Sequence, residues 1–175
     1  MAGAHKAPAA IETEALVPIN PVRTPTLKGR ALRYLAAREH SRAELTAKLA
    51  PHLTPDDPPD ALARVLDELQ AKGFIDEARV ADSVLHRRAP RLGGARVLQE
   101  LRAKGLPQPL LERAAEQLRG TELERARAVW RKKFGQPPQD ASARARQLRF
   151  LATRGFSGEV ARRVLQADGH GDENF

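Results

Sequence analysis

The sequence contains no cysteine, and its five histidines are scattered along the chain. Disulfide bonds and thiolate metal sites are therefore excluded. The histidines stand at positions 5, 40, 52, 86 and 170, so none pairs with another at the three-to-five-residue spacing of a helical or finger-type metal site. We therefore expect neither a metal ion nor another cofactor.

Aromatic residues are also scarce, at 4% of the 175 residues, whereas apolar residues as a class make up 41%. This balance favours helices packed through leucine, valine and alanine over β-sandwiches, which depend on aromatic and β-branched side chains. No apolar run approaches the roughly 20 residues that a membrane helix needs. The stretch 11–20 contains two acidic residues and Pro18, which argues against a signal peptide. We expect a cytoplasmic protein that does not enter membranes.

The usual signatures of catalysis are missing as well. The sequence has no Gly-x-x-x-x-Gly-Lys-Ser/Thr phosphate loop, no Gly-x-Gly-x-x-Gly after a strand and no Gly-x-Ser-x-Gly nucleophile elbow. The pair Gly93-Gly94 lies between two predicted helices and lacks a following Lys-Ser/Thr, so we interpret it as a helix start. We therefore predict a protein without enzymatic activity.

What the sequence does contain is an internal repeat with a period of about fifty residues. A shift of fifty residues superimposes 101–106 on 151–156, and a shift of fifty-two superimposes 41–49 on 93–101. In each unit we expect a basic residue followed by glycine to end a helix, at Lys72-Gly73, Lys104-Gly105 and Arg154-Gly155. Such a period is typical of supersecondary units that stack side by side and share a core. We predict an all-α fold of three tandem three-helix repeats that form an elongated, curved array.

The predicted organisation has five segments. They are a proline-containing flexible leader (1–26), three repeats (27–75, 76–120 and 121–167) and a short, polar, flexible tail (168–175). Ser41 with Glu44, and Thr121 with Glu124, each match a capping box, so we expect a helix to begin at each of these positions. In all, the pattern predicts nine short helices, three to a repeat.

The net charge of +8 is distributed unevenly. Residues 27–75 contain 8 basic and 7 acidic side chains, residues 76–120 contain 9 and 6, and residues 121–167 contain 11 and 4. A positive field at one end of an array attracts a polyanion or an acidic protein groove. A genome rich in G and C would also raise the arginine content, but it does not easily explain the gradient.

Three sets of basic residues are candidate contacts for a polyanion or an acidic protein groove. The clearest lies in the segment 130–135, where Trp130 and Phe134 share one helical face, which we expect to be core, while the cations Arg131, Lys132 and Lys133 point outward. A second set surrounds the predicted core residues Leu148 and Leu151 and comprises Arg144, Arg146, Arg149 and Arg154. A third set, Arg87, Arg88, Arg91 and Arg96, lies in the second repeat. The alternative readings are a solvated helix surface for the second set and helix-dipole stabilisation for the third.

Several stretches taken together resemble the RecX family, bacterial regulators of the RecA recombinase. The matching stretches span nearly all of residues 28–165 and are 31–35, 41–45, 66–81, 93–105, 132–135, 146–151 and 154–156. The resemblance implies nine helices in three repeats, binding in the helical groove of RecA–DNA filaments, damping of ATP hydrolysis and strand exchange, and DNA binding. The chain departs from the family pattern at Val80, Gly94 and Leu98, where an aromatic residue, proline and arginine are usual.

The leading hypothesis is a monomeric, non-enzymatic modulator of the RecA filament that mainly inhibits it, with roles in recombination, DNA repair and the SOS response. It would contact single- or double-stranded DNA directly or through RecA. One alternative is an autonomous DNA-binding protein that acts through the basic third repeat without RecA. Another is a structural scaffold for a different partner. A steep dependence of binding on salt would favour contact driven by phosphates alone.

Overall fold

The computed structural model describes residues 25–167, so the predicted tail and the predicted leader up to residue 24 lie outside the described residues. All regular structure within this range is helical, which confirms the all-α class. The elements are α1 (Leu27–Ala37), α2 (Arg42–Leu49), the short 3-10 helix η1 (Ala50–His52), α3 (Ala61–Ala71), α4 (Glu77–Arg88), α5 (Gly94–Ala103), α6 (Gln108–Lys133), α7 (Ala141–Thr153) and α8 (Gly158–Ala167).

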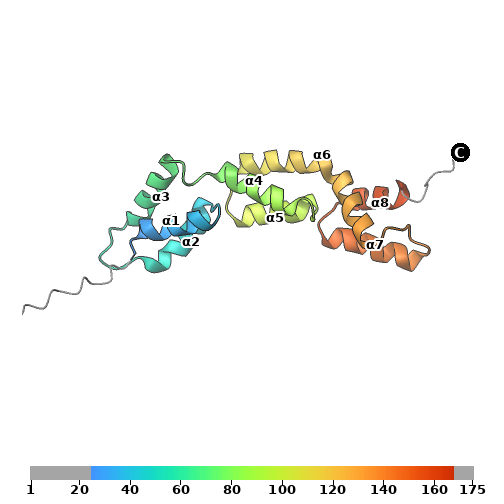
Figure 1. Cartoon of the computed structure of the whole chain (residues 1–175), viewed down its shortest axis with the longest axis horizontal. Helices are drawn as coiled ribbons and strands as arrows, with labels where there is room; N and C mark the ends of the chain where they lie inside the picture. Colours follow the sequence, from blue (N-terminus) through green and yellow to red (C-terminus); the bar gives the residue numbers. More distant parts are fainter. Residues whose placement is uncertain (1–24, 168–175) are drawn as a thin grey trace, which may run out of the picture.

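The helices form three groups that follow one another along the longest axis of the molecule (Figure 1). Each group has an apolar core of its own. The first is built around Leu45, Leu49, Leu66 and Leu69, the second around Val80, Val84, Val97 and Leu101, and the third around Ala126, Trp130, Leu151 and Val164. Because each core is separate, the molecule is an elongated row of three helical repeats.

The second and third repeats share one helix, and here the prediction of nine short helices is wrong. α6 continues for 26 residues, whereas a new helix was expected to begin at Thr121. The Thr121 hydroxyl caps nothing: it donates to the carbonyl of Gln117 at 3.4 Å and accepts from Nε of Arg125 at 3.0 Å. Keeping Gly120 inside the helix costs about 1 kcal/mol relative to alanine. A break would instead leave several backbone groups without partners.

Other helix ends follow their local sequence signals. The Ser41 hydroxyl accepts from the amide of Glu44 at 3.1 Å, and the Glu44 carboxylate accepts from the amide of Ser41 at 3.0 Å. The capping box predicted at this position is therefore confirmed. Asp76 caps α4 in a related way, because its carboxylate accepts from the amides of Ala78 and Arg79.

Three glycines in the left-handed region end helices in the same manner. Gly73, Gly105 and Gly155 have φ values of 73°, 71° and 85° and follow α3, α5 and α7. In each case the next residue donates its amide to a carbonyl five residues earlier, the pattern of a Schellman motif. Gly73, however, ends the third helix of its repeat, whereas the other two end the second. The three basic-glycine pairs are therefore the same turn at two different places in the repeat.

Candidate polyanion-binding face of the third repeat

Trp130 holds the last turns of α6 in the core of the third repeat. Its side chain is buried, and its Nε1 donates to Oε1 of the buried Gln147 on α7 at 2.7 Å. Nε2 of Gln147 donates in turn to the carbonyl of Gln136 in the connecting loop at 3.3 Å. Of the other residues expected in this core, Leu151 is buried, while Phe134 and Leu148 are half-buried against it.

An aromatic stack joins the end of α6 to α7. The ring of Phe134 meets the ring of Phe150 edge to face, with centroids 5.1 Å apart and an interplanar angle of 82°. The guanidinium of Arg154 lies 4.1 Å from the centroid of the same Phe150 ring. The stack therefore connects Phe134, which follows the first basic set directly in sequence, to Arg154 of the second.

The basic side chains near this stack are mostly exposed. Arg131, Lys132 and Lys133 are exposed on the last turn of α6, where cations also stabilise the negative end of the helix dipole. Arg146 and Arg149 are exposed on α7, whereas Arg144 and Arg154 are half-buried. Arg146 and Arg149 stand next in sequence to Gln147 and Phe150. The side chains of these two neighbours contact Trp130 of α6 and Phe134, the residue that follows α6. The two basic sets thus belong to helices in direct contact.

Ion pairing distinguishes this repeat from the other two. In the first two repeats many cations face carboxylates, in pairs that include Lys28 with Glu68, Arg38 and Lys104 with Glu44, Arg42 with Asp67, Arg79 with Glu39, and Arg88 with Glu100. Leaving Arg131 aside, no lysine or arginine of residues 121–167 lies within 4.0 Å of a carboxylate oxygen of the described chain. The positive charge of the third repeat is therefore left largely unneutralised.

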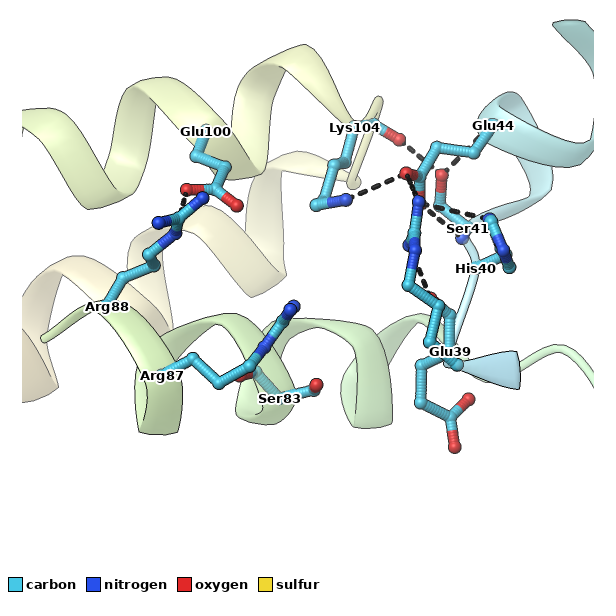
Figure 2. A network of polar contacts seen from close by, with 10 residues as sticks. Glu39, His40, Ser41, Glu44, Ser83, Arg87, Arg88, Glu100 and Lys104 are labelled. Carbon is cyan, nitrogen blue, oxygen red and sulfur yellow. Dashed lines mark hydrogen bonds and ion pairs between the residues drawn. The ribbon is translucent and has the colours of Figure 1, made fainter. Parts of the chain in front are cut away.

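The members of the third basic set have different partners. Nε of Arg88 lies 2.8 Å from Glu100, and Nε of Arg87 donates to the carbonyl of Ser83 in its own helix (Figure 2). Nε of Arg96 donates to the carbonyl of Thr153 in the third repeat at 3.3 Å. The side chain of Arg91 is exposed and makes no hydrogen bond or ion pair with the described residues, although its backbone amide donates to the carbonyl of Arg88 at 3.0 Å. Two members of this set therefore hold the fold together.

Arg125 is a residue that the sequence reasoning missed. It is half-buried on α6, and its guanidinium donates to the carbonyls of Ala89, Leu92 and Leu118 at 2.9, 2.6 and 2.8 Å. Burial lowers the pKa of Arg125, and the carboxylate of Glu122 partly opposes this effect. By fastening the end of α4 to the middle of α6, Arg125 sets the direction in which the third repeat leaves the second. No local sequence pattern predicts these contacts, because the acceptors Ala89 and Leu92 lie more than thirty residues away in the sequence.

Residues 25–167 lack two further features. No group of three or more histidine and acidic side chains in this range could hold a metal ion. No helix of the same range is long and apolar enough to cross a membrane.

Comparisons with known proteins converge on one family. Residues 121–165 match the model of the third three-helix domain of RecX. The chain is 60% identical over 145 residues to the regulatory protein RecX of Leptothrix cholodnii, covering 83% of this chain and 90% of that protein. It is 48% identical over 141 residues to that of Ralstonia nicotianae, covering 81% and 87%.

A solved structure shows the same fold. The crystal structure of RecX from Lactobacillus salivarius superimposes with a TM-score of 0.68 at 18% identity, over 82% of this chain and 94% of that one. The identities to the curated relatives are high and extend over most of both chains. The chain belongs to the RecX family of regulatory proteins.

Proposed function

We propose that this chain regulates RecA by binding in the helical groove of RecA–DNA filaments, and that it mainly inhibits ATP hydrolysis and strand exchange. The observation that supports this most is the unneutralised charge of the third repeat at one end of an elongated array. Exposed cations that lack carboxylate partners gain the most from meeting phosphates or an acidic protein surface, because they lose no existing ion pair.

The elongated shape supports the same proposal. Three repeats in a row can contact neighbouring subunits of a filament at once, so several weak contacts add up to a stable complex. A compact domain of the same size would reach fewer subunits. We propose that the chain acts as a monomer in the bacterial cytoplasm, where filaments on DNA form, and that it works by binding alone, without catalysis.

The test is the ATPase activity of RecA on single-stranded DNA, measured while this chain is titrated in. The proposal predicts a saturable fall in the rate of hydrolysis, together with slower strand exchange in a parallel assay. An unchanged rate at concentrations where the chain cosediments with the filament would contradict inhibition.

The unneutralised third repeat also fits a second function, an autonomous DNA-binding protein that needs no RecA. The two functions differ in their response to salt. Binding driven only by phosphates weakens log-linearly as salt rises, whereas docking in a filament groove should keep its preference for RecA-coated over bare DNA. Equal affinity for bare and coated DNA at every salt concentration would favour the second function.

A further inference from the structure

The first repeat contains nearly equal numbers of basic and acidic side chains, but not all of its cations pair with a carboxylate. Lys28, Arg38 and Arg42 are each within 3 Å of a carboxylate oxygen. Arg33 and Lys48 differ, because both are exposed and neither forms an ion pair with a described carboxylate. These two cations therefore contribute unpaired positive charge to the surface, although the net charge of the repeat is close to zero.

Tyr34 lies near both cations. Its ring is half-buried, and Nζ of Lys48 lies 4.9 Å from the ring centroid. The buried imidazole of His40 packs edge-on at a centroid distance of 5.9 Å, which restricts the tilt of the ring. Tyr34 also lines a hollow of about 330 Å³ together with Arg30 and Arg33. The first repeat thus presents an aromatic ring with cations around it.

Three acidic groups of this repeat already pair with other cations. Glu44 lies near His40 but already accepts from Arg38 and Lys104 (Figure 2). Asp67 and Glu68, on α3, pair with cations of α1 and α2 other than Arg33 and Lys48. The cations beside Tyr34 therefore remain available for an external anion.

We propose that this surface of α1 and α2 binds a single strand of nucleic acid. Arg33 and Lys48 hold phosphates, and a base stacks on the Tyr34 ring in place of the Lys48 ammonium, which lies over the ring in the free chain. Sites for single strands combine these two features, a cationic track for the backbone and an aromatic ring for the bases. An acidic peptide would use the cations but would leave the ring without a role. The site lies in the first repeat, at the opposite end of the row from the basic third repeat (Figure 1).

The experiment measures binding of the full chain to a fluorescein-labelled oligothymidylate by anisotropy, over a range of salt and without RecA. The double variant Arg33→Glu with Lys48→Glu should bind at least tenfold more weakly at low salt. The salt slope should fall by about 1.4, because each contact with a single strand contributes about 0.7. The matched control, Arg64→Glu on α3 with Lys72→Glu directly after it, makes the same charge change and should alter affinity less than threefold.

Stacking is tested separately at Tyr34. Tyr34→Phe should keep the parent affinity within twofold, whereas Tyr34→Leu should lose about fivefold or more, because stacking on an aromatic contributes about 1–3 kcal/mol per base. Thermal melting of each variant checks that it folds. If the Tyr34→Leu variant does not fold, the proposal is tested by the Arg33→Glu with Lys48→Glu variant.

Three results would overturn the proposal. The first is an unchanged affinity and slope in the charge variant, and the second is an equal loss in the control. The third is a variant that loses binding to the RecA filament while its affinity for the oligonucleotide is unchanged, which would make this surface a protein contact. Because the oligonucleotide assay contains no RecA, its outcome is independent of whether the chain inhibits RecA.

Discussion

The amide of Gly93 donates to the carbonyl oxygen of Arg154 at 2.8 Å and so fixes the start of α5 against the end of α7. The two backbones are in direct contact at this point, because a Cβ atom on Gly93 would lie 2.1 Å from backbone atoms of Gly155. At this point the joint between the second and third repeats is main chain against main chain, and the side chain of Arg96 adds a hydrogen bond to the carbonyl of Thr153.

The joint between the first and second repeats has the same form but a different chemistry. The Ser41 hydroxyl, at the start of α2, donates to the carbonyl of Lys104 at the end of α5 at 2.6 Å. Nζ of Lys104 then lies 2.7 Å from Glu44, which also accepts from Arg38 at 2.9 Å (Figure 2). In both joints the second helix of one repeat begins against the end of the second helix of the following repeat, α2 against α5 and α5 against α7. At the first of these joints charged side chains contribute to the contact.

Gly93→Ala should destabilise the chain. The added methyl group has no room against Gly155, so the backbone must shift, and overpacking of this kind costs roughly 1–3 kcal/mol. Chemical denaturation followed by circular dichroism measures the effect. Gly120→Ala is the control, because a Cβ there meets nothing within 4 Å and should stabilise α6 by about 1 kcal/mol. A G93A variant as stable as the parent would contradict the close contact.

The stability of the chain should fall as the pH drops below neutrality, because of His40. Its side chain is buried, its Nδ1 has no hydrogen-bond partner and lies 4.0 Å from Oε2 of Glu44. Burial lowers the pKa of His40 below 6.5, as do Arg38, Lys48 and Lys104, while Glu44 opposes them. Since the folded pKa lies below the unfolded one, the associated stability is present above pH 6.5 and is lost as the pH falls through the folded pKa.

Thermal melting between pH 7 and 5 measures this loss. His40→Gln has no titrating ring, so its melting temperature should decline less over that interval. Glu44 does not interfere: although burial raises its pKa, hydrogen bonds from Arg38, Lys104 and Ser41 lower the pKa of Glu44 to about 2. Its contribution is therefore lost only below about pH 4.5. Identical pH profiles for the parent and the variant would rule His40 out as the cause.

Gln147→Leu should also destabilise the chain, although leucine is the more usual core residue. Under the repeat alignment Gln147 takes the place of Val97 and Leu45. An apolar side chain there would leave Nε1 of Trp130 buried without its acceptor, which costs about 1–3 kcal/mol. Because Trp130 is the single tryptophan of the chain, urea denaturation can be followed by its fluorescence. An equal or higher free energy of unfolding in the variant would show that the hydrogen bond contributes less than the apolar contact.

The features that the sequence predicted well are those in which a residue acts on its own stretch of backbone. The capping box of Ser41 and Glu44 is one example, and the turns at Gly105 and Gly155 are others. Each depends on neighbours within a few residues, so the local pattern contains the needed information. The period of about fifty residues predicted the fold as well, because a regular sequence repeat indicates similar structural repeats that pack side by side.

Features that depend on distant partners could not be read in the same way. Thr121 carries the same capping pattern as Ser41, yet the helix continues through it. Arg96 was counted as a candidate contact, but it donates to the carbonyl of Thr153, fifty-seven residues away in the sequence. Arg125, with its acceptors Ala89 and Leu92, was not singled out at all. Charge counting indicated that the third repeat is basic, and the structure adds that its cations, Arg131 aside, lack within the described chain the carboxylate partners that eight cations of the other two repeats have.

The most direct test of the account compares RecA ATPase inhibition by two variants of equal charge. One replaces Lys132, Lys133, Arg146 and Arg149 of the third repeat with glutamate, and the other does the same to Arg64, Arg102, Arg113 and Arg119 of the first two repeats. All eight side chains are exposed, and the core residues Trp130 and Leu151 are untouched.

Circular dichroism should therefore show the parent's helix content in both variants. The account predicts that the third-repeat variant inhibits RecA at least tenfold less effectively, with a flatter salt dependence of binding, while the control stays within about threefold of the parent. Equal inhibition by the two variants, or a third-repeat variant that inhibits like the parent, would contradict the claim that the third repeat makes the contact.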